Sequence, residues 1–441
     1  MQKNLILLFF IIPIILWGQV PDSSNNYSDN GVRIDSITVV GNKQTDSDVI
    51  LRELTFSTGD TVDQQTLAYN KERIFSLGIF SSVNLIVRNE LNKNVLFIQV
   101  MESWYIYPLP FVSVIDHDWE KISYGINVFV KNFRGRNELL EGAGALGYDP
   151  STYLSYYNPY LFWQGNIFLN AILSYKNVEN KSQVAETIYG SNFDQKFFHA
   201  EIGIGKRFNL YNRFETILGY DYVSTPFYIK GINASNGRID RVPSVGFDYS
   251  FDSRDLIQFP KKGFYGDANI YFKGIGINNI NYRILNLDLR NYNELITDLY
   301  LKERVAARFT NGKTIPYYDY SFLGYDERIR GYFNDVLEGN NYYIGSVEMF
   351  TPLLKDMDLN LEFLPLLPKE LLNYRIAIYA ETFLDAGATQ FRGESFNVND
   401  FESGYGIGLT FLVLPYNLLR IEFALNQYHR SEWILELGTS F

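Results

Sequence analysis

The stretch 417–427, NLLRIEFALNQ, alternates between two kinds of residue. Leu419, Ile421, Phe423 and Leu425 are apolar, whereas the residues between them are charged, polar or small. Because successive side chains of a β-strand point to opposite faces, this pattern predicts a strand with one apolar and one polar face. Such a strand can separate lipid from an aqueous lumen, although the strands of a soluble β-sandwich alternate in the same way.

The same period of two recurs along residues 104–441 without a helical interruption. The repeated pattern favours a barrel over a sandwich, and the count of about 16 antiparallel strands is even, as in single-chain bacterial outer-membrane barrels. The strands are expected near 105–115, 122–132, 137–148, 151–160, 166–177, 197–208, 213–223, 242–253, 263–274, 282–292, 297–309, 342–351, 373–383, 403–413, 417–427 and 433–441.

A closed barrel also follows from the lack of long apolar stretches beyond the N-terminus. A membrane-spanning helix needs about 20 apolar residues, and without one only a closed barrel satisfies every backbone group in lipid. The 34 Tyr and 34 Phe residues suit the aromatic girdles of such a barrel.

Connection lengths orient the predicted barrel. Short turns such as Asn209–Asn212 are expected on the periplasmic side, and long loops such as Thr310–Asn341 outside, which places the N-terminal domain and the C-terminus in the periplasm. Pro352–Leu371 is an exception, because it is long, apolar and on the periplasmic side. Its amphipathic character predicts a surface helix.

The N-terminal part divides into three segments. Residues 1–19 have the positive start and short apolar core of a signal peptide, and the polar residues 20–31 read as a linker. Residues 32–102 then show the order β-α-α-β-β, which predicts a small α+β domain.

Composition excludes several kinds of function. The chain has no cysteine and only three scattered histidines, so we expect no metal site and no cofactor. The net charge of −11 argues against binding to nucleic acid. No Gly-x-Ser-x-Gly nucleophile elbow occurs, and we expect no enzymatic activity.

The small domain resembles a POTRA domain, the periplasmic module that precedes outer-membrane assembly and secretion barrels. The resemblance is carried by the Gly41-Asn42-x-x-Thr45 turn and by the helix-to-strand turn with Gly78 and Phe80. It implies that an edge strand, for which Phe80–Val87 is the candidate, can receive client polypeptides or periplasmic accessory proteins by backbone pairing. The same edge could instead only dock on the barrel.

The barrel resembles the BamA/TamA type of the outer-membrane assembly superfamily, also called the bacterial surface antigen family. Motifs of that family occur in order along the chain, and the C-terminal Phe441 resembles the signal by which such barrels are recognised for insertion. The motifs are Asp252-Ser253-Arg254-Asp255 at a periplasmic turn, Arg330-Gly331-Tyr332 in the longest outer loop, Gly345 and Glu348 on the next strand, and Phe383-x-Asp385-x-Gly387 on the strand after it.

The barrel resemblance implies that the long loop folds inward and places Arg330 in the lumen. Asp385 and Glu348 are its expected partners, since strand parity turns both inward and an Arg fork can hold a carboxylate by two bonds. Gly331 would permit a tight backbone, and Tyr332 would pack on the wall. This set either locks the loop and the resting shape of the barrel or only fills a wide lumen.

The family resemblance implies a non-enzymatic factor that inserts or translocates polypeptides in the outer membrane of a Gram-negative bacterium. A single POTRA-like domain differs from the several domains of BamA-like and TamA-like members, which leaves the specific role open. The alternatives are a passive outer-membrane pore and a dedicated two-partner-type secretion transporter. Outer-membrane lipid, client polypeptides and periplasmic accessory proteins are the expected partners.

Overall fold

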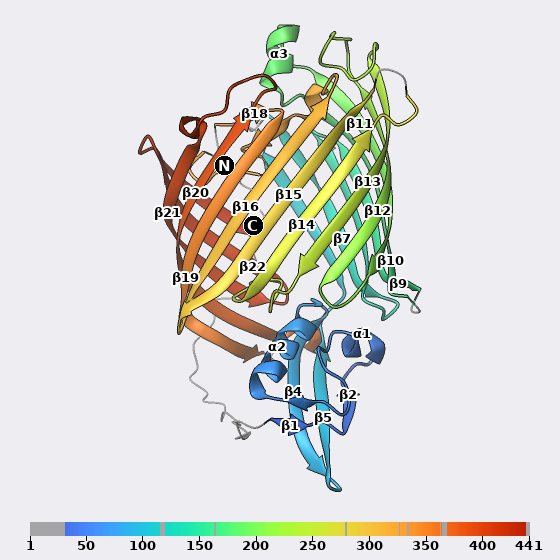
Figure 1. Cartoon of the computed structure of the whole chain (residues 1–441), viewed down its shortest axis with the longest axis vertical. Helices are drawn as coiled ribbons and strands as arrows, with labels where there is room; N and C mark the ends of the chain where they lie inside the picture. The colour runs from blue at the N-terminus through green and yellow to red at the C-terminus, as the bar shows by residue number, and fades with distance from the viewer. Residues whose placement is uncertain are drawn as a thin grey trace.

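The computed structural model describes residues 31–114, 120–162, 165–277, 280–325, 327–332, 335–361, 363 and 368–437. The predicted signal peptide, the linker except for Gly31, and Phe441 lie outside the described residues. The rest forms a large barrel-shaped sheet with a small domain at one end (Figure 1). We call that end of the barrel the domain-side end.

Sixteen antiparallel strands build the large sheet, which confirms the predicted fold class and strand number. Each strand pairs with its neighbours in chain order, from β6 at one end of the sheet to β23 at the other. The strands are β6 (Ile106–Val114), β7 (Ile122–Phe133), β8 (Glu138–Gly147), β9 (Ser151–Phe162), β10 (Ile167–Glu179), β11 (Asp194–Arg207), β12 (Asn212–Ser224), β13 (Ile239–Asp252), β14 (Gly263–Lys273), β15 (Tyr282–Ile296), β16 (Leu299–Gly312), β19 (Asn341–Asn360), β20 (Asn373–Gln390), β21 (Glu402–Leu414), β22 (Asn417–Asn426) and β23 (Ser431–Leu437).

The two faces of the sheet differ as the alternation predicts. Large apolar side chains such as Leu218, Val305 and Ile407 are more than half exposed on the outer face, as lipid-facing residues should be. On β22, Arg420 and Glu422 are completely buried on the inner face. The lumen is therefore lined with polar and charged groups, many of which pair with one another.

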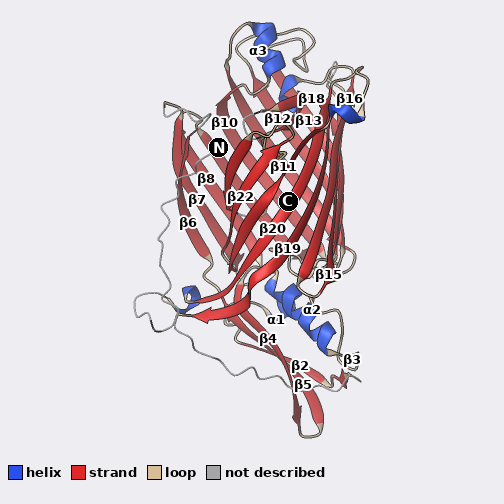
Figure 2. Cartoon of the chain, turned by 90° about the vertical axis from the view of Figure 1, so that its left-hand side faces the viewer, coloured by secondary structure: helices blue, strands red, loops and turns tan. Residues whose placement is uncertain are grey.

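The N-terminal domain has the predicted order, with two short strands in addition. Its three-stranded sheet has the order β2-β5-β4, in which β2 and β5 are parallel and β4 forms one edge. The helices lie on the side of this domain that is nearest the barrel (Figures 1 and 2). The elements are β1 (Val32–Arg33), β2 (Ser36–Val40), α1 (Ser47–Leu51), β3 (Thr61–Val62), α2 (Gln64–Phe75), β4 (Phe80–Glu90) and β5 (Lys93–Glu102).

The turn residues singled out in this domain have distinct structural tasks. Gly41 has a φ of +97°, and an added Cβ would come within 2.0 Å of the Val100 carbonyl oxygen. Asn42 donates from its amide nitrogen to the Thr45 carbonyl oxygen at 2.9 Å, just before α1. Gly78 also has a positive φ of +68°, and Phe80 is fully buried in the core.

One continuous apolar core joins the domain to the domain-side end of the barrel. Domain residues such as Ile74 and Phe75 belong to the same buried cluster as Phe259, Phe350 and Tyr379 of the barrel. Phe259 lies in the connection between β13 and β14, and its ring centroid is 4.7 Å from that of Tyr379 and 5.0 Å from that of Phe350. Tertiary packing thus fixes the domain against the barrel.

The expected surface helix over Pro352–Leu371 is wrong. β19 continues to Asn360 and pairs with an equally extended β20, with irregularities after Pro352 and Leu354. Only the 3-10 turn η3 (Lys369–Leu371) has helical geometry in the described part of this segment. Prolines at 352, 365 and 368 disfavour a helix, and the neighbouring strand satisfies the backbone instead.

The opposite end of the barrel carries the long connections. They contain the helix α3 at that end (Figure 1) and, within the longest loop, a two-stranded sheet of β17 and β18. No helix among the described residues has the length and apolarity needed to cross a membrane. The elements are α3 (Gln183–Tyr189), η2 (Tyr317–Asp319), β17 (Ser321–Leu323), β18 (Leu337–Gly339) and η4 (Val398–Asp400).

Candidate functional site

Arg330 lies inside the barrel and is 3% exposed. Its guanidinium donates from Nε and Nη2 to the two carboxylate oxygens of Asp385, each at 2.7 Å. Its Nη1 donates to Glu422 at 2.8 Å and lies 3.4 Å from Glu348. The Arg330 side chain thereby ties the loop after β17 to three wall strands, β19, β20 and β22.

The contacts of Arg330 extend into a larger group of buried charges. Lys302 on β16 donates to Glu348 at 2.6 Å and lies over the rings of Phe259 and Phe350. Arg420 on β22 pairs with Glu381 at 3.1 Å. We call this set the lumen charge cluster; each of its seven members is at most 5% exposed. The cluster consists of Lys302, Arg330, Glu348, Glu381, Asp385, Arg420 and Glu422.

The backbone around Arg330 fits the wall closely. Gly404 on β21 leaves room for it, because a Cβ there would come within 1.8 Å of the Arg330 carbonyl oxygen. Gly331 has a φ of +96°, which favours glycine, and its carbonyl accepts from the Asn426 amide at 3.3 Å. Tyr332 is buried and donates its hydroxyl to Glu402 at 2.6 Å.

The structure brings together most of the residues singled out in the barrel sequence. Arg330 meets both Asp385 and Glu348, and its guanidinium carbon lies 3.6 Å from the ring centroid of Phe383. An added Cβ on Gly387 would come within 3.0 Å of the Ile329 side chain in the same loop. Phe383 and Gly387, which were singled out only as a strand motif, therefore contact the loop directly.

Sequence reasoning missed four members of the lumen charge cluster. Glu422 and Arg420 lie at inward positions of the alternating stretch 417–427, so strand parity places them in the lumen. Parity does not say which inward residues meet across the barrel, however. The missed residues are Lys302, Glu381, Arg420 and Glu422.

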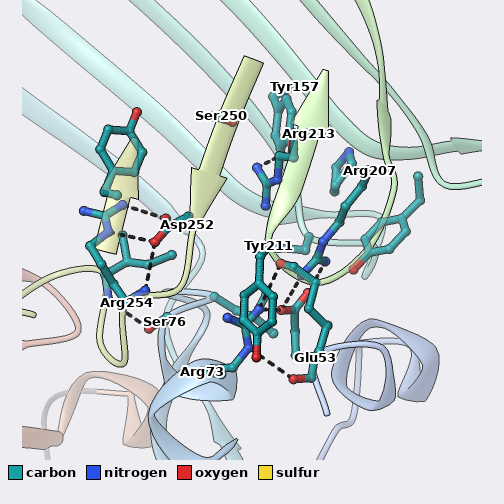
Figure 3. A pocket seen from close by; sticks show the side chains of 17 residues that line it. Glu53, Arg73, Ser76, Tyr157, Arg207, Tyr211, Arg213, Ser250, Asp252 and Arg254 are labelled. Atoms are coloured by element: carbon teal, nitrogen blue, oxygen red, sulfur yellow. Dashed lines mark hydrogen bonds and ion pairs between the residues drawn. The ribbon is translucent and has the colours of Figure 1, made fainter. Parts of the chain in front are cut away.

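A second charged site lies where the domain docks on the barrel (Figure 3). Glu53, just after α1, accepts from Arg207 at the end of β11 at 2.9 Å and from Arg73 on α2 at 2.8 Å. Arg73 and Arg207 are 9% and 7% exposed. We call Glu53, Arg73 and Arg207 the docking triad, because the Glu53 carboxylate pairs with one arginine of the domain and one of the barrel.

Further polar contacts between the domain and the barrel complete the junction. Asn132 at the end of β7 donates to the Thr45 hydroxyl at 2.8 Å, and Arg375 on β20 pairs with Glu72 at 2.6 Å. Ser76 accepts from the backbone N–H of Ile257 at 3.0 Å. The domain therefore contacts turns from several regions of the barrel wall.

A cavity of about 370 Å³ lies beside the docking triad. Arg213 and Arg254 line it together with the triad, and Arg254 pairs with Asp252 at 2.7 Å. Figure 3 shows these side chains in the region between the domain and the wall, with Arg254 directed at Asp252. The family-motif residues Asp252–Asp255 therefore belong to the docking region.

The charges of the docking triad predict that attachment of the domain weakens in acid. Burial by itself raises the pKa of the Glu53 carboxyl, but hydrogen bonds and charge from Arg207, with charge from Arg73, outweigh burial and hold the pKa below its usual 4.5. A carboxyl whose pKa is lower in the docked than in the undocked state stabilises docking at pH values above the undocked pKa. This stabilisation is lost as the pH falls through the pKa of the docked state.

We therefore expect docking to weaken progressively below about pH 4.5. Spin labels on Asp48→Cys and Phe208→Cys, both exposed in a chain without native cysteine, would show a broader distance distribution in acid. Burial raises the pKa of the nearby Asp255 carboxyl, so burial favours the protonated form of that residue in this structure. Glu53→Gln should give the same distance distribution at neutral and at acid pH, because residue 53 then has no proton to gain; a further broadening in acid in that variant would show that another group causes it.

Among the residues that the structure describes, no group of three or more His, Asp or Glu side chains could hold a metal ion. His199 pairs with Asp221 on the wall at 2.6 Å. Both charged sites described above hold protein segments against one another.

Comparison with protein-family models gives two matches. Residues 132–441 match the Omp85 superfamily domain, and residues 32–102 match a POTRA model described as a surface antigen variable number repeat. Comparison with curated protein sequences gives no match.

Solved structures with a similar fold include BamA from Haemophilus ducreyi lacking POTRA domains 1–3. The TM-score is 0.53 at 15% identity, over 92% of this chain and 84% of that chain. CdiB from Acinetobacter baumannii gives 0.49 at 13% identity over 92% and 73%. CdiB from Escherichia coli gives 0.46 at 11% identity over 95% and 92%. At this level of identity, the BamA likeness concerns the fold alone.

Proposed function

The chain belongs to the Omp85 superfamily, and from that membership we propose that it assembles or translocates polypeptides in the outer membrane of a Gram-negative bacterium, without enzymatic activity. In this proposal the POTRA domain and the C-terminus lie in the periplasm. The POTRA domain receives clients or periplasmic accessory proteins, and the barrel acts in the membrane.

The observation that carries the proposal is the contact between the POTRA edge strand and β20, a wall strand that contributes to the lumen charge cluster. β4 is an edge strand of the POTRA sheet, and it contacts β20 of the barrel. β20 also provides Asp385 and Glu381 to the cluster. A polypeptide paired with β4 would therefore lie near a strand that holds the inner loop.

The occupied lumen favours this function over the alternative of a passive pore. The loop with Arg330 is bound to the wall inside the barrel, and Phe259 is fully buried at the domain-side end. Docking of the POTRA domain covers the same end (Figures 1 and 2). A steady, wide conductance would require these contacts to open.

Photo-crosslinking in living cells tests the proposal. A photoreactive residue at the exposed Arg88 on β4 should capture nascent outer-membrane proteins or one exported polypeptide. The matched control is Val40, exposed on the opposite edge strand β2. Nascent barrel proteins would identify assembly, and a single secreted protein would identify two-partner-type translocation. Equal capture at both positions, or no capture together with a large steady conductance, would contradict the proposal.

A further inference from the structure

The cavity beside the docking triad has an excess of positive charge. Its charged lining residues are four arginines and two carboxylates, so the lining has a formal charge of +2. The whole chain, in contrast, has a net charge of −11. Charges in partly enclosed sites are normally paired, so this excess points to an anionic ligand. The six residues are Glu53, Arg73, Arg207, Arg213, Asp252 and Arg254.

Two arginines of the cavity keep hydrogen-bond donors that the described residues do not use. Arg207 gives both of its terminal nitrogens to Glu53, but its Nε is buried and has no hydrogen-bond partner among those residues. Arg213 has no carboxylate partner in the described part of the chain, and its side-chain bond to the Tyr157 hydroxyl is 3.5 Å long. Figure 3 shows Arg213 next to Tyr157, on the barrel side of Glu53. These donors remain for a ligand.

The positive lining comes from both parts of the molecule. Arg73 belongs to α2 of the domain, whereas Arg207 ends β11 and Arg213 lies at the beginning of β12. Arg254 follows β13 in the turn that contacts the domain. The complete set of donors therefore exists only while the domain is docked. A ligand that binds the complete set stabilises the docked state, because it does not bind the undocked state equally well.

We propose that this cavity binds a phosphate monoester group and that its occupancy strengthens docking of the POTRA domain. The cavity volume of about 370 Å³ is in the usual range of small-molecule pockets, which is about 300–1,000 Å³. The proposal does not depend on the proposed function, because no client polypeptide takes part in it.

The chemistry of the lining selects this class of anion. A phosphate monoester carries about −1.5 to −2 charges at pH 7 and has three strong acceptor oxygens, which matches the charge of the lining. Arginine holds phosphate oxygens by two parallel bonds from its planar fork. A chloride ion or a single carboxylate would leave one positive charge without a partner.

Equilibrium dialysis with sn-glycerol 3-phosphate tests the site. The full-length protein is placed in phosphatidylcholine nanodiscs, and the ionic strength is kept constant because salt screens such charges. We expect saturable binding of glycerol 3-phosphate and no binding of glycerol, which lacks the phosphate. Arg213→Gln should weaken binding by about tenfold or more, the usual effect of losing a hydrogen bond between charged groups. Because Arg213 is exposed, this variant should fold normally.

The matched control is Arg33→Gln. It removes an exposed arginine of the POTRA domain that does not line the cavity, so the affinity should not change. Absence of saturable binding, equal binding of glycerol, or equal affinity in Arg213→Gln and Arg33→Gln would overturn the proposal.

A second arm identifies the source of the phosphate. A soluble metabolite and a lipid with a terminal phosphate present the same group, so the dialysis is repeated in nanodiscs with phosphatidic acid. Phosphatidylglycerol, which is also anionic but is a phosphate diester, is the control lipid. Weaker binding of glycerol 3-phosphate with phosphatidic acid than with phosphatidylglycerol assigns the ligand to the membrane. Equal binding assigns it to soluble compounds, and both results support the site.

Spin labels test the link between the ligand and docking. Glu53→Ala removes a carboxylate from the lining and raises its formal charge from +2 to +3. Millimolar glycerol 3-phosphate should therefore narrow the distance distribution between labels at Asp48→Cys and Phe208→Cys in this variant, and Arg213→Gln should abolish the narrowing. If Glu53→Ala stays docked, the ligand should instead raise the urea concentration at which the labels of the otherwise native protein separate. No narrowing in an undocked Glu53→Ala variant, or no rise in the urea midpoint, would refute the effect on docking.

Discussion

Arg330→Ala is expected to destabilise the folded barrel by about 3–5 kcal/mol, the usual cost of removing one partner from a buried ion pair. The substitution leaves Asp385 and Glu422 without their strongest shared partner while both stay buried. It also removes the contact with Phe383. The free energy of unfolding in urea, measured in lipid vesicles with the heat-modified gel shift as readout, tests this prediction.

Two variants separate the role of Arg330 from general effects of losing a charge. Arg330→Lys keeps the charge but cannot reproduce the two parallel bonds to Asp385, so we expect an intermediate loss. Arg430→Ala removes an arginine whose side chain is 73% exposed and lies 3.7 Å from Asp335, and it should cost less than about 1 kcal/mol. Equal stability of Arg330→Ala and Arg430→Ala would show that the lumen charge cluster does not stabilise the barrel.

The same variants distinguish a lock from a filler. If Arg330 locks the loop, Arg330→Ala should increase protease cleavage near Tyr332 and raise the single-channel conductance. A filler role predicts lower stability with neither change. We propose the lock, because Arg330 joins the loop to β19, β20 and β22 at once and Gly404 leaves room for its backbone.

Strand periodicity predicted much of the barrel because it follows from backbone geometry alone. The alternation in 417–427 indicates that Arg420 and Glu422 face inward, and strand parity indicates the same for Glu348 and Asp385. All four side chains are buried. Periodicity has no information about distance across the lumen, however. The contact of Lys302 with Glu348 depends on register between β16 and β19, which the sequence pattern does not set.

The segment after Pro352 shows a different limit of sequence reasoning. An amphipathic stretch between two strands is compatible with a surface helix or with longer strands. The outcome depended on β20, whose residues 373–379 offered β19 an extended partner. Hydrogen-bond satisfaction by a neighbouring strand thus decided the local structure.

Docking of the POTRA domain was also beyond the sequence. Glu53 and Arg207 are separated by 154 positions and belong to units whose separate patterns give no sign of a shared interface. Gly135 illustrates the closeness of the fit, because an added Cβ would come within 2.0 Å of the Gln44 carbonyl oxygen.

Glu53→Ala is expected to release the POTRA domain from the barrel. The substitution leaves Arg73 and Arg207 close together and largely buried with no carboxylate between them. Removing one partner of such a buried group costs about 3–5 kcal/mol. Since each 1.4 kcal/mol is a factor of ten, the docking equilibrium should shift by about a hundredfold or more. Spin labels at Asp48→Cys and Phe208→Cys should then show a broad distance distribution at neutral pH.

The control and the double variant make this prediction specific. Glu90→Ala removes an exposed glutamate at the end of β4 and should leave the distance distribution narrow. Adding Arg207→Ala to Glu53→Ala removes one of the two unpaired arginines. The loss of docking free energy in the double variant should therefore be smaller than the sum of the losses in the two single variants. We expect a coupling free energy of about 0.5–3 kcal/mol. A narrow distribution in Glu53→Ala, or strict additivity in the cycle, would show that the apolar core around Phe259 holds the domain without help from the docking triad.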